Sequence, residues 1–303
     1  MIIHETLIPA PEFAPFTYAR YRPLLLAREP AAGGHRCRVI GAWVNGREVG
    51  AALVFPFYED RPRYRLLSVF VAPDHRRGGI GSALLAAAEG LVAAAGGCEI
   101  MAVHSNRLRG IDAYLGLMRG RGWSAPELLE TRIMGPARWV HAARESWTPL
   151  FARLDSLGYS TTPYFDKTPE DDAAIHRLES EGLVEPMFRT PEFIDHGHPL
   201  FSLVLRQHGA VVGWIIGEVG TTFNGIHYTL GYVRPDLRRS GWLLRGLWDV
   251  SHRQYVAFGP DSISAFETPG DNTAMTSLIQ RRLRPLFPEG VDMRFTMSKQ
   301  ISA

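Results

Sequence analysis

Seven consecutive residues, RRGGIGS at Arg76–Ser82, have the composition of a phosphate-binding loop. An apolar run, LLSVFV, precedes them and an alanine-rich helical pattern follows, so they stand where a strand turns into the N-terminus of a helix. The first turn of a helix offers unpaired backbone N–H groups and a partial positive charge, which bind phosphate when no Cβ obstructs the approach. Gly78, Gly79 and Gly81 lack that atom.

The other side chains of this loop favour the same ligand. Arg76 and Arg77 would place positive charge beside a phosphate, and Ser82 offers a hydroxyl at the start of the helix. The loop has neither the GK[ST] of a Walker loop nor the GxGxxG of a dinucleotide-binding fingerprint. The alternative is a glycine-rich turn that only begins a helix.

The segment that carries the loop occurs twice in the chain. VAPDHRRGG at Val71–Gly79 returns as VRPDLRRSG at Val233–Gly241, at an offset of 162 residues with six of nine positions identical. Upstream, NGREVGAALV aligns with HGAVVGWIIG, and downstream EIMAV from Glu99 aligns with SISAF from Ser262, both at an offset of 163. A repeat of domain length indicates two copies of one folding unit.

Each copy shows the pattern strand, strand, strand, helix, strand, helix. The 303 residues, 46% of them hydrophobic, are enough for two domains of about 150 residues. We predict domains over 1–140 and 148–303, with a linker across Gly135–Trp147 that contains Pro136.

Composition excludes several classes of protein. The net charge is only +2 and the basic residues are scattered, so nucleic acid is not an expected partner. Cys37 and Cys98 have no CxxC spacing, which favours a reducing compartment and predicts neither a disulfide framework nor a metal site. The N-terminus lacks a signal-peptide pattern and no apolar run reaches 18 residues, so we expect a cytoplasmic protein without a membrane partner.

In this context the sequence resembles the GNAT superfamily of acyltransferases. There, an apolar strand runs into [QR]-x-x-G-x-[GA], followed by a helix and a strand that ends near an Asn. The matching residues here are Val69–Val71, Arg76–Gly81 and Asn106. The resemblance covers both halves and implies an α/β (mixed α+β) protein of two tandem GNAT-like domains, each a mixed, mostly antiparallel sheet flanked by helices.

The resemblance also implies acetyl-CoA or another acyl-CoA as cosubstrate, without a metal. The pyrophosphate would bind the loop N–H groups, the pantetheine would pair with the strand before the loop, and a backbone N–H near Phe70 would polarise the thioester carbonyl. An amine would attack directly, without a covalent enzyme intermediate. The cofactor-binding residues it implies are Val69, Phe70, Val71, Arg76, Arg77, Gly78, Gly79, Ile80, Gly81, Ser82 and Asn106.

Direct attack requires a general base for the amine and a general acid for the departing thiolate. Family members often have a tyrosine acid in the helix after the Asn, and Tyr114 lies one residue beyond that spacing. Its alternative role is ordinary half-buried packing. The frequent glutamate base of the family falls at Arg65, which cannot accept a proton, so His104 at the end of the next strand is the nearest candidate.

The second copy offers a candidate base, but its glycine-rich loop is altered. His227 stands where the first copy has Arg65 and could serve as a base, and Glu267 lies on the following strand. Its loop, however, reads RRSGWL, with Trp242 and Leu243 in place of small residues. We therefore expect this copy to be degenerate for coenzyme A, and either to recognise the acceptor or to serve only as scaffold.

Three functions remain open at this stage. The leading hypothesis is N-acylation of a small-molecule amine, with catalysis in the N-terminal half, by a monomer or homodimer. A non-catalytic acyl-CoA-binding regulator is the second, and catalysis in the C-terminal half through His227 is the third.

Overall fold

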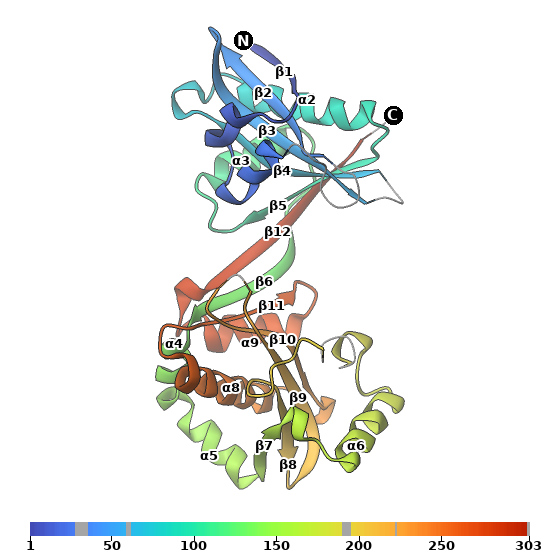
Figure 1. Cartoon of the computed structure of the whole chain (residues 1–303), viewed down its shortest axis with the longest axis vertical. Helices are drawn as coiled ribbons and strands as arrows, with labels where there is room; N and C mark the ends of the chain where they lie inside the picture. Colours follow the sequence, from blue (N-terminus) through green and yellow to red (C-terminus); the bar gives the residue numbers. More distant parts are fainter. Residues whose placement is uncertain (28–35, 59–61, 190–194, 222, 302–303) are drawn as a thin grey trace. The chain divides into compact units, whose positions relative to one another are not determined.

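A computed structural model describes residues 1–27, 36–58, 62–189, 195–221 and 223–301. The chain forms two compact units: unit 1 comprises Met1–Leu129 with Met293–Ala303, and unit 2 comprises Glu130–Asp292 (Figure 1). Among the described residues, no helix is long and apolar enough to cross a membrane.

Unit 1 is a six-stranded sheet with helices packed against it. In spatial order its strands are β1 (Ile2–Thr6), β2 (Arg38–Val44), β3 (Arg47–Tyr58), β4 (Arg63–Val71), β5 (Glu99–Ser105) and β12 (Val291–Gln300). Only β4 and β5 run parallel. The helical elements are η1 (Pro11–Phe16), η2 (Ala19–Tyr21), α1 (Arg22–Leu26), η3 (Pro73–His75), α2 (Ile80–Ala94) and α3 (Ile111–Gly120).

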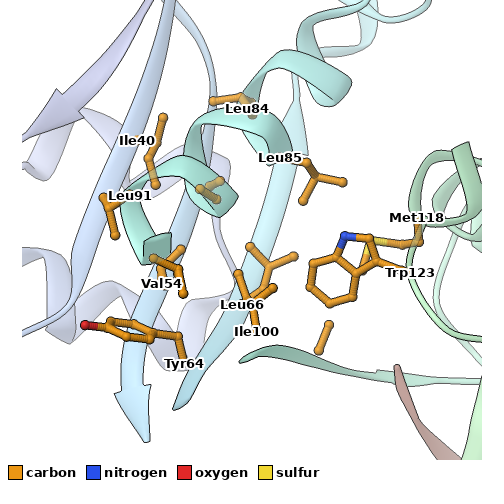
Figure 2. Close-up of a cluster of buried hydrophobic side chains, with 14 of the residues drawn as sticks. Ile40, Val54, Tyr64, Leu66, Leu84, Leu85, Leu91, Ile100, Met118 and Trp123 are labelled. Carbon is orange, nitrogen blue, oxygen red and sulfur yellow. The ribbon is translucent and has the colours of Figure 1, made fainter. Parts of the chain in front are cut away.

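The alanine-rich helix α2 forms the centre of the unit 1 core. Its apolar residues recur at helical spacing, and Leu84, Leu85 and Val92 are fully buried against the sheet (Figure 2). Strand side chains that meet this face include Val54 and Leu66. This packing fixes the N-terminus of α2 at the end of β4.

Unit 2 repeats the arrangement. In spatial order its strands are β6 (Glu127–Pro136), β11 (Ile263–Pro269), β10 (Gly225–Val233), β9 (Ala210–Val219), β8 (Leu203–Gln207) and β7 (Tyr159–Pro163), and only β10 and β11 run parallel. Its helical elements are α4 (Ala137–Ala142), η4 (Glu145–Trp147), α5 (Thr148–Ser156), η5 (Tyr164–Asp166), α6 (Pro169–Ser180), η6 (Pro186–Phe188), η7 (Pro235–Leu237), α8 (Trp242–Phe258), α9 (Thr273–Leu278), η8 (Ile279–Leu283) and η9 (Pro288–Gly290). The expected mixed, mostly antiparallel sheets flanked by helices are confirmed.

Each sheet receives its last strand from the other half of the sequence. Strand β6 leaves the N-terminal half and pairs antiparallel with β11, from Pro136 opposite Ile263 to Glu130 opposite Pro269. Strand β12, from the end of the chain, returns and pairs antiparallel with β5 (Figure 1, red). The units therefore differ from the predicted domains 1–140 and 148–303.

The segment expected to be a linker, Gly135–Trp147, has regular structure instead. Gly135 belongs to β6, where the ring of Trp139 would lie 2.4 Å from an added Cβ. Pro136 precedes the first residue of α4, a position at which its missing N–H does not interrupt the helix. Gly135 allows close packing and Pro136 precedes a helix. Composition alone predicts a linker, because glycine and proline are also typical of linkers.

One aligned segment also slips by one residue. Arg65 pairs with Met101 across β4 and β5, whereas its counterpart His227 pairs with Ala265, so the strand offset is 164 and not 163. The cause is the intervening helix, because α2 has 15 residues and α8 has 17. A slip of one residue reverses the face on which each side chain lies.

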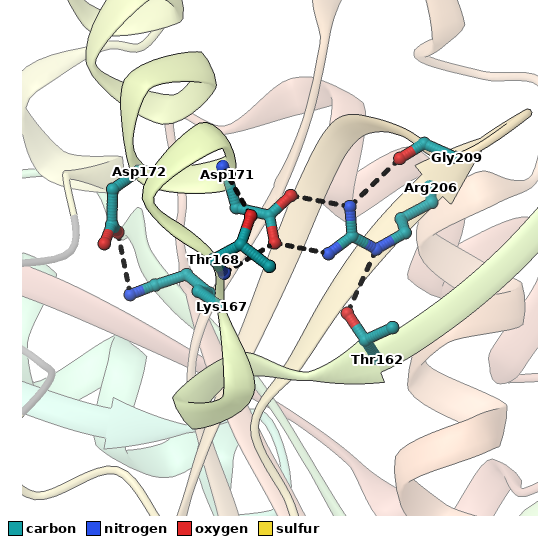
Figure 3. A network of polar contacts seen from close by, with 7 residues as sticks. All are labelled: Thr162, Lys167, Thr168, Asp171, Asp172, Arg206 and Gly209. Carbon is teal, nitrogen blue, oxygen red and sulfur yellow. Dashed lines mark hydrogen bonds and ion pairs between the residues drawn. The ribbon is translucent and has the colours of Figure 1, made fainter.

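A buried ion pair ties α6 to the sheet of unit 2. The Arg206 guanidinium on β8 donates to both carboxylate oxygens of Asp171 at 2.7 Å, and to Thr162 and the Gly209 carbonyl (Figure 3). Asp171 also closes a capping box with Thr168 at the start of α6. Arg206 lowers the pKa of Asp171 to about 2.

We predict that Arg206→Leu lowers the free energy of unfolding by about 3 kcal/mol at pH 7, because it leaves the Asp171 carboxylate buried and unpaired. The Asp171 pKa is lowered in the folded state, so its stabilisation is present above the ordinary value near 3.9 and is lost as pH falls toward about 2. Denaturant unfolding of both proteins should therefore show a difference that shrinks below about pH 4. Arg234→Leu removes the exposed pair with Asp236 and should change little.

Candidate active site

The candidate site of unit 1 begins where its two parallel strands separate. Strands β4 and β5 pair only from Arg63 with Glu99 to Leu66 with Ala102. Beyond these pairs, β4 continues to Val71 beside β3, and β5 continues to Ser105 beside β12. The facing edges of β4 and β5 are therefore not paired with each other beyond Leu66 and Ala102.

The backbone of β4 presents alternate groups to this opening. The Ala72 N–H donates to the Val49 carbonyl on β3, at 2.8 Å. Since backbone direction alternates along a strand, the polar groups of Val69 and Val71 face the opposite edge, toward β5. Phe70 has its backbone toward β3, so Val69 and Val71 are the better placed residues for pairing with a pantetheine chain.

The glycine-rich loop follows directly and begins α2. Arg77 and Gly79 have φ angles of 67° and 79°, and Gly79 is the N-cap residue of α2, with no side chain hydrogen-bonded as a cap. Gly78 and Gly79 are exposed, and an added Cβ would meet no heavy atom closer than 3.8 Å at Gly78 and none within 4 Å at Gly79. The first turn of α2 is thus accessible to an anion.

Gly81 also has a packing role, and its role in binding coenzyme A stays a prediction. A Cβ at Gly81 would lie 3.3 Å from the Leu117 side chain on α3 and 3.8 Å from that of Val71. Glycine here lets α2, α3 and the end of β4 approach one another. Leu117 is one helical turn from Tyr114, so this contact joins the start of α2 to the helix that carries the candidate acid.

His104 and Tyr114 come together on the β5 side of the opening. Their ring centroids are 5.4 Å apart in an edge-on arrangement, and the ring of Phe295 on β12 stacks on His104 at 5.6 Å. His104 is 7% exposed, and its Nε2 makes no hydrogen bond within the described part of the chain. Burial lowers the pKa of His104, which keeps the imidazole neutral and able to accept a proton.

Tyr114 lies in the first turn of α3, which begins after Gly110 in the left-handed conformation. Burial raises its pKa, with a smaller contribution from nearby Tyr18, so the phenol stays protonated and can act as a donor. Tyr18 precedes η2 and forms an aromatic pair with Tyr21, with the Arg20 guanidinium over both rings. Sequence reasoning missed this segment, since no motif marks it.

Asn106 holds a strand in place. Its side-chain oxygen accepts from the Met293 N–H at 3.1 Å, and its own N–H donates to the Met293 carbonyl at 2.9 Å. These bonds fasten the end of β5 to β12. A role of Asn106 in binding coenzyme A stays a prediction.

The corresponding loop of unit 2 has the same backbone but is closed. Arg239 and Gly241 have φ angles of 65° and 99°. Leu150 of α5 would lie 2.6 Å from a Cβ on Gly241, and the Arg153 guanidinium donates to the Ser240 carbonyl. Helix α5 therefore packs on the loop where a phosphate would have to approach.

The substituted residues of this loop complete the closure. Leu243, which replaces the last glycine, lies 3.1 Å from the Cβ position of Gly231 on β10, so it packs on the face of the sheet over the residue that corresponds to Val69. Trp242 is only 1% exposed and packs into the core beneath α8, so it stabilises the helix and does not stand beside a phosphate as its position in the motif predicts.

His227 belongs to an ion-pair cluster on the sheet of unit 2. Its Nε2 lies 2.5 Å from a carboxylate oxygen of Glu267, whose other oxygen is 2.9 Å from Nε of Arg132 on β6. The hydrogen bond to Glu267 raises the pKa of His227. A histidine held this way is a poorer proton acceptor at neutral pH than His104.

No group of three or more His, Cys, Asp or Glu side chains is placed to hold a metal ion in the described ranges. The candidate site of unit 1 combines a cationic, glycine-rich helix start, an open strand edge, and a buried histidine next to a half-buried tyrosine.

Comparison with known proteins shows a family match for the first part of the chain and a shared fold for all of it. Residues 3–117 match the model of the acetyltransferase (GNAT) family. A tandem GNAT protein from the clavulanic acid biosynthesis pathway superposes with a TM-score of 0.51 at 15% identity, over 100% of this chain and 99% of its own. A GCN5-related N-acetyltransferase from Sphaerobacter thermophilus superposes with a TM-score of 0.52 at 15% identity, over 100% of this chain and 96% of its own. A search of curated proteins found no match. Residues 3–117 therefore match a GNAT acetyltransferase domain, and the chain as a whole has the fold of a tandem GNAT protein.

Proposed function

We propose that the chain transfers an acyl group, in the first instance acetyl, from acyl-CoA to the amine of a small molecule, with the chemistry in unit 1. One observation carries the proposal. The exposed loop at the start of α2 follows the open edge of β4, and a Cβ at Gly81 would contact Leu117, one helical turn from the Tyr114 ring that packs against His104.

Each part of this arrangement suits one part of the cosubstrate. The pyrophosphate would bind the N–H groups at the start of α2 and the charges of Arg76 and Arg77. Arg76 is held at the loop by its Nε–H bond to the Val71 carbonyl, at 2.9 Å. The pantetheine would extend along Val69 and Val71 as an added strand, which directs the thioester toward β5 and α3.

Two side chains can accept and donate the protons that the transfer requires. The amine lone pair attacks the thioester carbonyl, the C–S bond breaks, and the amide nitrogen loses a proton while the thiolate gains one. Neutral His104 would accept the proton from the amine nitrogen, and Tyr114 would donate to the sulfur. Neither step needs a covalent enzyme intermediate.

The closed loop of unit 2 argues against catalysis there. Leu150 packs on the loop and Leu243 replaces its last glycine, which would hinder close approach of a phosphate, and the Nε2 of His227 is already bonded to Glu267. In this proposal unit 2 contributes structure to the chain and no second catalytic centre.

The test is release of free CoA from acetyl-CoA with a panel of small amines, amino acids and amino sugars. We expect amine-dependent turnover whose kcat/KM rises with pH through the lowered pKa of His104 and is level from neutral pH upward, because the neutral imidazole is the active form. His104→Gln should remove this acidic limb. Tight binding of acetyl-CoA without turnover for any amine would instead support the regulator.

A further inference from the structure

The catalytic histidine proposed for unit 1 has a neighbour from the far end of the chain. We propose that Phe295 of β12 is a positioning residue that holds the His104 imidazole for proton transfer, so that the strand after the second copy completes the site of the first. This inference rests on the proposed function of His104.

The two residues are direct partners across the sheet. In the antiparallel pairing of β5 and β12, Phe295 stands opposite His104 and Arg294 stands opposite Ser105. Side chains of opposed residues lie on the same face of a sheet. The two rings are accordingly stacked, with centroids 5.6 Å apart and planes inclined by 15°.

Hydrogen bonds do little to orient this imidazole. Its Nε2 has no partner among the described residues, and its Nδ1 lies 3.4 Å from the carbonyl oxygen of the adjacent Ser105. Catalytic histidines are usually oriented by a hydrogen bond to the ring nitrogen that does not react. Here the imidazole lies between Phe295 and the edge-on ring of Tyr114, so packing against these two rings orients it.

Strand β12 is fastened to unit 1 on both sides of Phe295. At one end Met293 exchanges hydrogen bonds with Asn106. At the other, the Lys299 ammonium donates to the Glu89 carboxylate at 2.8 Å and to the Arg121 carbonyl at 2.7 Å. Phe295 is therefore held on a rigid element, as positioning requires.

These contacts also indicate a structural role for the second copy. Residue 295 follows His104 by 191 positions, and every residue of unit 2 lies between β5 and the strand that covers its edge. The second copy thus returns the chain to the active site, which requires neither coenzyme A binding nor catalysis by unit 2.

The experiment compares Phe295→Leu with Phe295→Tyr and with Met297→Leu in the full chain. Met297 lies two residues along β12 on the same face and is 2% exposed, so it controls for loss of packing in the strand. We expect Phe295→Leu to lower kcat about tenfold with an unchanged KM for acetyl-CoA. We also expect the acidic limb of its pH profile to move to higher pH as water reaches the imidazole. Phe295→Tyr should restore both properties.

Titration of the His104 imidazole by NMR reads the positioning without turnover, and should show a higher pKa in Phe295→Leu than in the wild type or Met297→Leu. An unchanged imidazole titration in a folded Phe295→Leu protein, or a kcat and pH profile equal to those of Met297→Leu, would overturn the proposal. Absence of turnover in the wild type would contradict the proposed function instead, and the NMR titration would still decide whether Phe295 controls the imidazole.

Discussion

Calorimetric titration with coenzyme A should give one binding site per chain, although the fold is present twice. In unit 1 the loop residues Gly78 and Gly79 are exposed and the edge of β4 is open. In unit 2 helix α5 packs on the loop through Leu150, and Leu243 stands in place of the last glycine and packs on the face of β10 over Gly231. Backbone N–H groups must come within about 3 Å of phosphate oxygens, and these side chains prevent that approach.

Two arginines at equivalent positions provide a matched test. Arg77 and Arg239 are both exposed, have φ angles of 67° and 65°, and make no ion pair within the described part of the chain. Arg77→Glu should weaken coenzyme A binding by about 10², since it removes a charge-assisted contact and adds repulsion. Arg239→Glu should leave the affinity nearly unchanged. Two equivalent sites, or a single site lost only with Arg239→Glu, would reverse the roles assigned to the units.

The phosphate loop could be predicted from the sequence because its determinants are local. The glycines, the paired arginines and the following apolar helix are contiguous, and the same nine-residue pattern occurs in both copies. The structure retains this even in the closed copy, where Arg239 and Gly241 adopt the same left-handed conformations as Arg77 and Gly79. Local sequence fixes the loop backbone, whereas accessibility depends on what packs against it.

The strand exchange could not be predicted in this way, because it depends on pairing between segments far apart in the chain. Nothing near His104 indicates that Phe295 lies opposite it, and the strands β6 and β12 carry no motif that distinguishes one sheet from the other. From the sequence, only Trp242 and Leu243 predict that the second loop cannot bind coenzyme A. The structure adds Leu150 and Arg153 of α5, an element without a counterpart in the family pattern.

Spacing arguments failed where a helix changed length. Helix α8 is two residues longer than α2, so the offset of 162 at the loop becomes 164 at the next strand. The sequence alignment has 163 there, so the residues that it matches lie on opposite faces. The extra residue before Tyr114, in contrast, did not move the tyrosine away from the candidate site. Helix α3 begins after Gly110, and this start places the tyrosine beside His104 in spite of the irregular spacing.

Tyr114→Phe should lower kcat by about 10² with little change in the KM for acetyl-CoA or the amine, the pattern of a group used in the transition state. The phenol ring lies edge-on next to His104, and Tyr114 is one helical turn from the contact of Leu117 with the loop. Burial raises its pKa, so it should remain a proton donor well above neutral pH. Removing only the hydroxyl keeps the ring that packs edge-on against His104.

Tyr64→Phe is the matched control, since Tyr64 is a buried tyrosine of the same apolar cluster, on β4. It should leave kcat unchanged at a comparable cost in stability. Product analysis by mass spectrometry under single-turnover conditions would separate slow chemistry from slow product release. If Tyr114→Phe retained the wild-type single-turnover rate, Tyr114 would be a packing residue, and the proton for the thiolate would have to come from water or from the acceptor ammonium itself.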